Sequence, residues 1–212
     1  MLIEKSVKDF IYEVKSDNPT PGGGSVSALA GSLGAALSNM VGNLTIGKGK
    51  YEEIPEEKRT LLEINQEKLS FLIDDLLSIV DEDSTAFDDV MKAFKLPKST
   101  EEEKQIRSEK IQLGYKKALE VPLKCAQKCL ETLNLQKVFA EYGNVNAITD
   151  VGVGTLLAYS GLEGALFNVT INLKSIKDEE YREKIEKAVK ESLEKGKELK
   201  EEILGIVYKR LS

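Results

Sequence analysis

An uncharged stretch near the amino terminus decides the fold, and it reads PTPGGGSVSALAGSLGAALSNMVGNLTIGK over residues 19–48. Its first part cannot be helical, because prolines restrict the residues before them and consecutive glycines carry a large conformational entropy cost. Ser25 is a favoured N-cap residue, so the stretch predicts a helix over Ser25–Ile46. Small side chains allow helices to approach closely, which predicts a central core helix.

The absence of charge between Asp17 and Lys48 also raises the possibility of a transmembrane span. Several side chains in the stretch are polar, and such a helix would be poorly suited to face lipid. These polar residues are Ser25, Ser27, Ser32, Ser38, Asn39, Asn43 and Thr45. We therefore predict that the chain has no membrane partner.

A second segment rich in small residues, Ala147–Leu173, carries charge only at Asp150 and Glu163. Its last part, 167–173, alternates apolar and polar residues, which is typical of a strand. No partner strand is evident, so we predict a helix instead, with Asn168 and Asn172 on one face.

Apolar residues at helical spacing predict the remaining elements. We expect a short amphipathic helix near Leu2–Val14 and a long helix that begins at Pro55 and ends at Leu96-Pro97. Thr100 with Glu103 resembles the capping box of a following helix. Pro122 should bend that helix. A final helix should run from 178 to 210, with acidic residues first and basic residues last.

These patterns predict one all-α domain over residues 1–212, a bundle of long antiparallel helices with a small-residue core. With 41% hydrophobic and 31% charged residues, the composition is that of a folded globular protein. The net charge of -6 argues against a nucleic-acid partner. Charged residues in the first ten positions argue against a secretory signal, so we expect a cytoplasmic protein. Cys125 and Cys129 are expected to be buried packing residues.

The absence of histidine limits the chemistry that the chain can perform. It removes the commonest zinc ligand and the usual proton carrier near neutral pH. The two cysteines lack a second pair, so we predict no metal site. A Ser-His nucleophile is excluded as well, and carboxylate acid–base chemistry remains.

One carboxylate interrupts an apolar stripe of the predicted long helix. The stripe alternates steps of four and three residues and consists of Leu69, Ile73, Leu76, Val80, Asp83, Phe87, Val90 and Phe94. A carboxylate buried there must find partners or shift its pKa, because unpaired buried charge is strongly unfavourable. Alternatively, a kink or helix end near Asp81 returns Asp83 to water. Periodicity alone leaves both interpretations open.

The glycines before the first small-residue helix form a candidate anion site. Backbone N–H groups at a helix amino terminus, together with the helix dipole, favour a negatively charged ligand. The spacing of Gly22, Gly23, Gly24 and Ser25 fits neither the dinucleotide fingerprint nor the Walker A pattern. Lys48 and Lys50 follow the other end of the same helix, where they could cap carbonyls or meet substrate carboxylates.

Several short motifs occur in one order along nearly the whole chain. They are Pro19–Ser25, Met40-Val41, Leu44-Thr45, Gly47-Lys48, Val80–Phe87, Leu96-Pro97-Lys98, Val121-Pro122-Leu123, Gly143-Asn144, Thr149-Asp150 and Phe167–Leu173. Together they strongly resemble the formiminotetrahydrofolate cyclodeaminase and methenyltetrahydrofolate cyclohydrolase family. The resemblance implies a homodimeric helical fold that binds reduced folate, with Asp83 as the catalytic carboxylate. Ser84-Thr85 stand where relatives often have Ala-Glu.

The resemblance also implies a reaction and a binding site. On 5-formiminotetrahydrofolate the chain would act as a cyclodeaminase, forming 5,10-methenyltetrahydrofolate and ammonia with no cofactor beyond the tetrahydrofolate substrate. The alternatives are methenyltetrahydrofolate cyclohydrolase and a non-catalytic folate-binding or dimeric adaptor protein. The expected substrate-binding residues are Gly22, Gly23, Gly24, Ser25, Lys48 and Lys50 at the glutamate tail, and Asn144, Asp150, Asn168 and Asn172 at the pterin.

Overall fold

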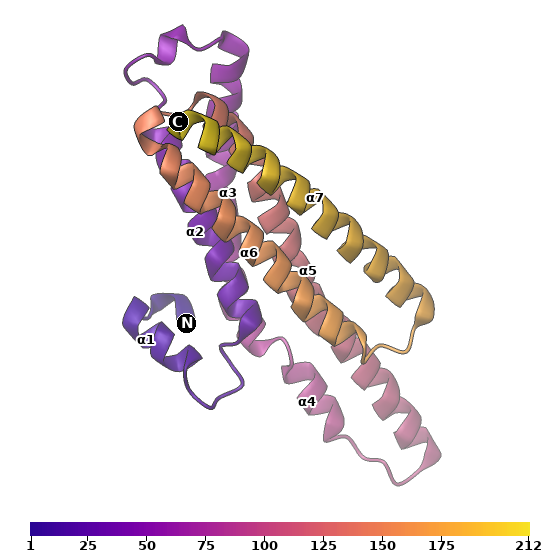
Figure 1. Ribbon diagram of the computed structural model, residues 1–212. Coiled ribbons are helices and arrows are strands. Elements are labelled where there is room, and N and C mark those ends of the chain that lie inside the picture. The colour runs from indigo at the N-terminus through magenta and orange to yellow at the C-terminus, as the bar shows by residue number, and fades with distance from the viewer.

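A computed structural model describes residues 1–212, and all of its regular elements are helices (Figure 1). This confirms the prediction of an all-α bundle. The α-helices are α1 (Val7–Val14), α2 (Gly23–Asn43), α3 (Glu56–Thr85), α4 (Asp88–Phe94), α5 (Glu101–Tyr142), α6 (Ile148–Leu173) and α7 (Glu179–Leu211). Three 3₁₀ turns are η1 (Leu2–Glu4), η2 (Tyr51–Glu53) and η3 (Val145–Ala147).

The long helices α2, α3, α5, α6 and α7 lie alongside one another, and α2 and α6 form the most extensive pair (Figure 1). The shorter elements lie outside this bundle. Helix α1 lies beside the start of α2, while α4 and the first turns of α5 extend as an arm beyond the end of α3. No helix has the length and apolar character needed to cross a membrane.

Helices α2 and α6 are antiparallel and touch through their backbones. A Cβ atom at Gly34 would lie 2.7 Å from the carbonyl oxygen of Gly154, and one at Gly161 would lie 2.7 Å from that of Ser27. Neither position has room for any larger residue. The predicted small-residue core is therefore confirmed, because close approach of the two helices depends on glycine.

Buried polar side chains in the core have hydrogen-bond partners on neighbouring helices. The side-chain amide of Gln136 on α5 donates to the Gly34 carbonyl at 3.2 Å and to Ser38 Oγ at 2.9 Å. The amide of Asn65 on α3 donates to the Leu135 carbonyl at 3.1 Å. Since burial of an unsatisfied amide is costly, these contacts favour one register of α2 against α5 and of α3 against α5.

Some predicted helix bounds are wrong. Helix α2 begins at Gly23 with Gly22 as its N-cap, so Ser25 is the third helical residue rather than the cap. Pro55 is the N-cap of α3 rather than its first residue. The predicted amino-terminal helix is divided into η1 and α1, because Ser6 caps a new helix by accepting a hydrogen bond from the Asp9 amide.

The predicted long helix from Pro55 to Leu96 is also divided, because α3 ends at Thr85 and α4 begins at Asp88. In the apolar stripe Leu69, Leu76 and Val80 are buried and Ile73 is partly buried, but Phe87 and Phe94 are 42% and 43% exposed. The change of direction between α3 and α4 removes these two rings from the bundle, so the seam prediction was wrong for Phe87 and Phe94, although Val90 is buried as predicted.

Pro122 lies inside α5, which continues past it to Tyr142 without ending. Two predictions about α5 and α6 are confirmed. Cys125 and Cys129 are both buried and unpaired, as expected for packing residues. The segment 167–173 is helical, which confirms the choice of helix over strand.

Candidate active site

The candidate site forms where the start of α2 meets the last turn of α3 and the final turns of α6. A Cβ atom at Gly24 would collide with the carboxyl group of Asp83, and one at Gly23 would lie 3.3 Å from Nδ2 of Asn168. The glycines of the loop therefore leave space that two polar side chains from other helices occupy. The structure brings Gly22, Gly23, Gly24 and Ser25 together with Asp83 and Asn168.

Asp83 is partly buried and bonds to the first turn of α2. The Ser25 hydroxyl donates to Asp83 Oδ2 at 2.9 Å, and the Ser25 backbone amide is also hydrogen-bonded to the carboxylate. Amides in the first turn of a helix have no partner within the helix, so a carboxylate from α3 satisfies one of them. The interpretation that returned Asp83 to water is therefore wrong.

Burial raises the pKa of Asp83 above its usual value. The two hydrogen bonds from Ser25 act in the opposite direction, but they do not outweigh desolvation of the charged form. No lysine or arginine forms an ion pair with this carboxylate, which would otherwise lower its pKa. A carboxyl group in such surroundings is suited to accept and return a proton.

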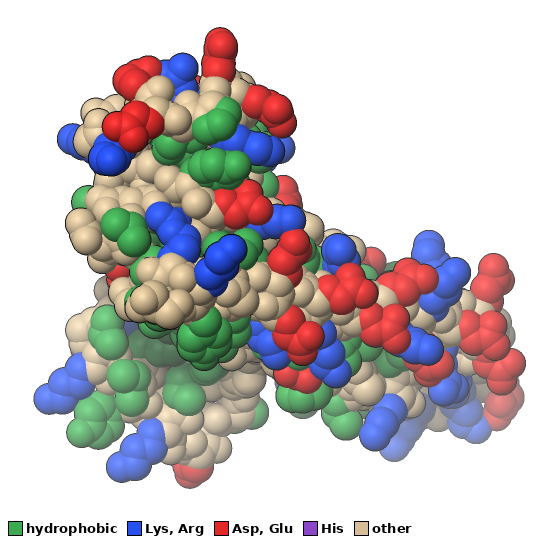
Figure 2. Space-filling view, turned by 45° about the horizontal axis from the view of Figure 1, so that its top comes forward, with side chains coloured by type: hydrophobic (Ala, Val, Ile, Leu, Met, Phe, Trp, Pro, Cys, Tyr) green, Lys and Arg blue, Asp and Glu red, His purple; other side chains and the backbone are tan.

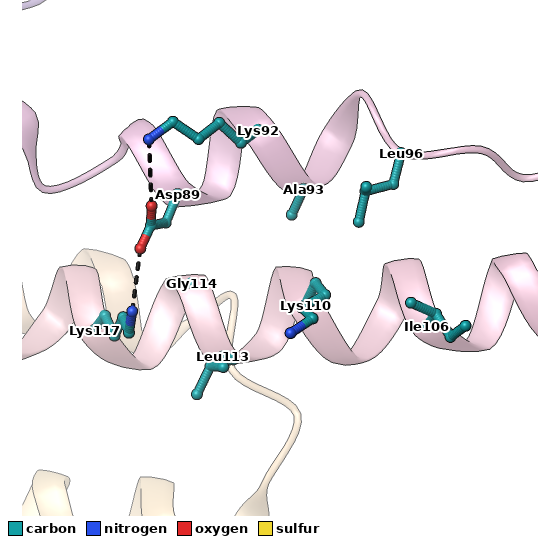
Figure 3. A pocket seen from close by; sticks show the side chains of 9 residues that line it. All are labelled: Asp89, Lys92, Ala93, Leu96, Ile106, Lys110, Leu113, Gly114 and Lys117. Atoms are coloured by element: carbon teal, nitrogen blue, oxygen red, sulfur yellow. Dashed lines mark hydrogen bonds and ion pairs between the residues drawn. The ribbon is translucent and has the colours of Figure 1, made fainter.

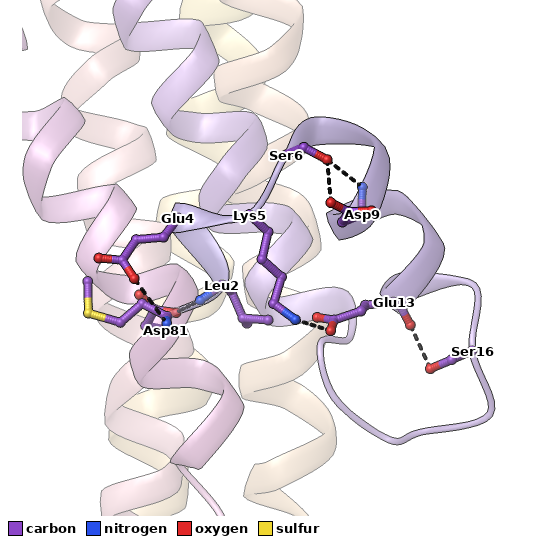
Figure 4. Close-up of polar contacts among 9 residues, drawn as sticks. Leu2, Glu4, Lys5, Ser6, Asp9, Glu13, Ser16 and Asp81 are labelled. Atoms are coloured by element: carbon purple, nitrogen blue, oxygen red, sulfur yellow. Dashed lines mark hydrogen bonds and ion pairs between the residues drawn. The ribbon is translucent and has the colours of Figure 1, made fainter.

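The two acids that precede Asp83 have other partners. Asp81 accepts a hydrogen bond from the Leu2 amide and thereby ties the amino-terminal segment to α3 (Figure 4). Glu82 pairs with Lys124 of α5 at 3.2 Å and accepts a hydrogen bond from the Ser78 hydroxyl at 2.9 Å. Asp83 is thus the one member of the acidic triplet that neither pairs with a lysine nor bonds to the amino-terminal segment.

Asn168 offers a second polar group at the site. Its Nδ2 donates to the Gly164 carbonyl at 2.9 Å, which leaves its carbonyl oxygen free to accept a hydrogen bond. Asn172 lies one turn further along α6, partly buried, and makes no hydrogen bond to Asp83 or to the glycine loop. Of the predicted pair, only Asn168 contacts the loop.

An apolar cavity of about 430 Å³ lies between the amino-terminal segment, α2 and α3. Val26, which follows Ser25, and Val80, one turn before Asp83, both line it, although Asp83 itself does not. Figure 2 shows hydrophobic side chains gathered around this amino-terminal region, at the lower left. A cavity of this size and apolar lining is large enough for part of a small-molecule ligand.

The predicted binding residues at the other end of α2 are not part of this site within one subunit. Lys48, Lys50 and Asn144 line a different cavity, and Asp150 lies in the first turn of α6. Helix α2 has 21 residues, so the two ends are roughly 30 Å apart at 1.5 Å per residue. Within a single chain an unbroken helix therefore separates Lys48, Lys50 and Asn144 from Asp83.

The sequence of this chain is similar to those of known proteins. A sequence profile described as Formiminotransferase-cyclodeaminase matches residues 6–191. The chain belongs to this family. A methenyltetrahydrofolate cyclohydrolase from Methylorubrum extorquens is 40% identical over 212 residues and is covered completely, as is this chain. A formimidoyltransferase-cyclodeaminase from Gallus gallus is 38% identical over 99% of this chain, which spans 38% of that protein's length.

A solved structure supports the same assignment. The formiminotetrahydrofolate cyclodeaminase of Thermotoga maritima matches with a TM-score of 0.78 and 31% sequence identity. The match covers 100% of this chain and 98% of that one. The cyclodeaminase-type fold therefore accounts for the whole chain.

Sequence reasoning did not place the amino-terminal segment next to the candidate site. Leu2, Phe10 and Ile11 line the apolar cavity beside the acid. The apolar pattern of residues 2–14 did predict that this segment has a buried face, but it did not show which helices that face would contact.

A third cavity, of about 340 Å³, lies within the arm between α4 and the first turns of α5 (Figure 3). Asp89 pairs there with Lys117 at 3.2 Å and with Lys92 at 3.6 Å. Hydrogen bonding to Lys117 lowers the pKa of Asp89. This carboxylate is exposed and fixed in its charged form, in contrast to Asp83.

Proposed function

We propose that the chain is a folate one-carbon enzyme in which Asp83 is the acid–base group. The observation that carries the proposal is a partly buried carboxylate with a raised pKa and no cationic partner, held at the start of α2. The names of the relatives, which include both a cyclohydrolase and cyclodeaminases, support a substrate of the tetrahydrofolate class.

The first proposed reaction is the cyclodeamination of 5-formiminotetrahydrofolate. The formimino nitrogen is protonated, the lone pair of N10 attacks the adjacent formimino carbon, and the new C–N bond closes the ring. Asp83 takes the proton from N10 and returns it to the amino nitrogen, whose C–N bond then breaks to release ammonia. The product is the 5,10-methenyl cation, and the regenerated Asp83 carboxylate stabilises its positive charge. Because the attack is intramolecular, positioning supplies much of the acceleration.

The second candidate is hydrolysis of the methenyl bridge, and the full-length relative at 40% identity favours it. Water adds to the bridging carbon while Asp83 accepts its proton. Asp83 then gives that proton to N5 as the bond between N5 and the bridging carbon breaks, and the hydroxyl proton leaves to solvent, which yields the N10-formyl product. The two reactions need the same carboxylate at the same carbon. They differ in whether ammonia leaves or water enters.

The test is a spectroscopic assay of both substrates, following gain or loss of methenyl absorbance, with the wild type and Asp83→Asn. Asparagine keeps the size and can still accept a hydrogen bond from Ser25, but it cannot carry the proton. We expect the rate on the true substrate to fall roughly 10²- to 10⁴-fold. Wild-type turnover by the variant would show that Asp83 is not the acid–base group. No activity of the wild type on either substrate would favour a non-catalytic folate-binding or dimeric adaptor protein.

We propose in addition that the enzyme is a homodimer that uses the uncharged outer face of α2 and α6. Large apolar side chains are exposed along this pair. They are Val26, Leu33, Met40, Val153, Leu156, Phe167 and Ile171. Exposed large apolar side chains gathered on one pair of helices are typical of an interface. Light scattering of the intact chain should give twice its mass of 23.5 kDa, and a monomer would contradict the proposal.

A further inference from the structure

A cavity of about 440 Å³ lies at the end of the bundle opposite Asp83. The loop after α2, the turn between α5 and α6, and the last turns of α7 form its walls. The lining consists of Leu44, Thr45, Lys48, Gly49, Lys50, Tyr51, Ile54, Tyr142, Gly143, Asn144, Val145, Asn146 and Arg210. It contains three cations and no carboxylate, although the chain as a whole carries a net charge of -6.

The loop at this cavity exposes unpaired backbone donors. Gly47 and Gly49 have left-handed φ angles of 66° and 50°. The amides of Gly47, Gly49 and Lys50 make no hydrogen bond, whereas the Lys48 amide donates to the Thr45 carbonyl. Unpaired backbone N–H groups in a turn with left-handed residues attract anions.

The positive charges of the cavity are not compensated. Arg210 donates to the carbonyls of Ala140 and Gly143 at 2.6 and 2.8 Å and forms no ion pair, which leaves its remaining N–H groups unused. Lys48 also has no ion pair. Lys50 lies 3.6 Å from Glu53, but both side chains are largely exposed, so that contact neutralises little.

The walls are held in place by hydrogen bonds between the two loops. The Asn144 amide donates to Thr45 Oγ1 at 2.9 Å, and its side-chain amide donates to the Leu44 carbonyl at 3.1 Å. Arg210 ties the end of α7 to the same turn. The cavity is therefore formed before any ligand arrives, which reduces the entropy cost of binding.

We propose that this cavity is a second binding site, separate from Asp83, for an anion that carries carboxylate or phosphate groups. Two sources supply this chemistry. One is a free small anion. The other is the glutamyl tail of the substrate, an assignment that rests on the proposed function. A tail would need several glutamyl units to extend from the acid to this cavity in one subunit, since α2 spans the distance between them.

The test is calorimetric titration of the intact Asp83→Asn protein at low ionic strength, with γ-linked triglutamate and with inorganic phosphate as probes. The test variant is Lys48→Gln/Lys50→Gln, whose side chains are exposed. The matched control is Lys92→Gln/Lys117→Gln, which removes the same charge from the arm. We expect at least one probe to bind tenfold more weakly to the test variant and with unchanged affinity to the control.

Equal affinities for the two double variants, or no binding of either probe to the Asp83→Asn protein, would overturn the proposal. Because binding is measured without turnover, failure of the proposed reaction does not affect this result. The source is decided by KM for monoglutamyl and triglutamyl substrates with Asp83 intact. A higher KM for the triglutamyl substrate alone in the lysine variant identifies the tail. Loss of phosphate binding with both KM values unchanged identifies a free anion.

Discussion

The regions near the two ends of α2 differ in charge. At its start, Asp83 lies among glycines and serine with no cation nearby, while beyond its end Lys48, Lys50 and Arg210 line a cavity with no carboxylate. The roughly 30 Å between them exceeds the screening length of about 8 Å at physiological salt. The basic groups therefore cannot lower the pKa of Asp83. The separation lets one chain hold an anion firmly and still keep a carboxylate that exchanges its proton.

Filling the space at the start of α2 should have the largest effect on stability and turnover. In Gly24→Ala, the new methyl group occupies the position of the Asp83 carboxyl group and must displace it. We expect a loss of about 1–3 kcal/mol in the free energy of unfolding. We also expect a fall in turnover close to that of Asp83→Asn. Chemical denaturation and the methenyl assay measure the two effects.

Gly205→Ala is the control, since nothing lies within 4 Å of a Cβ there and the residue is helical. It should stabilise the protein by up to about 1 kcal/mol through helix propensity and leave turnover unchanged. A Gly24→Ala protein with normal stability and rate would show that Asp83 does not need this space.

Removing one hydrogen bond from the carboxylate should have a smaller effect. Ser25→Ala deletes the hydroxyl donor that lowers the pKa of Asp83, so that pKa should rise further. The reaction needs the carboxylate form to accept a proton, so the acidic limb of the pH–rate profile should move to higher pH. One hydrogen bond contributes about 1 kcal/mol, so the maximal rate should fall less than about tenfold.

The pH–rate profile of Ser25→Ala is measured with the methenyl assay. An acidic limb that stays in place, or moves to lower pH, would mean that another group sets it. Ser25→Thr retains a hydroxyl and should restore the wild-type limb.

The sequence predicted the residue at the centre of the site by two independent routes. The apolar stripe of α3 singled out Asp83 as its one carboxylate, and the family motifs pointed to the same position. The glycine loop was predicted as well, because consecutive glycines before a small-residue helix leave amides exposed. What periodicity could not decide was whether Asp83 was buried, since that depends on contact with Ser25 from another helix.

Other features depended on packing that local sequence does not encode. Gly23 and Gly24 are helical although their intrinsic helix preference is low, and a side chain at Gly24 would collide with the Asp83 carboxyl group. The change of direction after Thr85 has no proline or glycine to mark it. The separation of Lys48 from Asp83 could have been predicted, since the length of the expected helix and its rise per residue already imply it.

The backbone contact between Gly34 and Gly154 has a mechanical consequence. Because no side chain separates the two helices there, a rotamer change cannot alter their spacing. We therefore expect α2 and α6 to resist bending and to behave as one rigid unit, like a beam. A molecule that touched both ends of this beam would be selected by its length, since the protein cannot shorten the span to accommodate it.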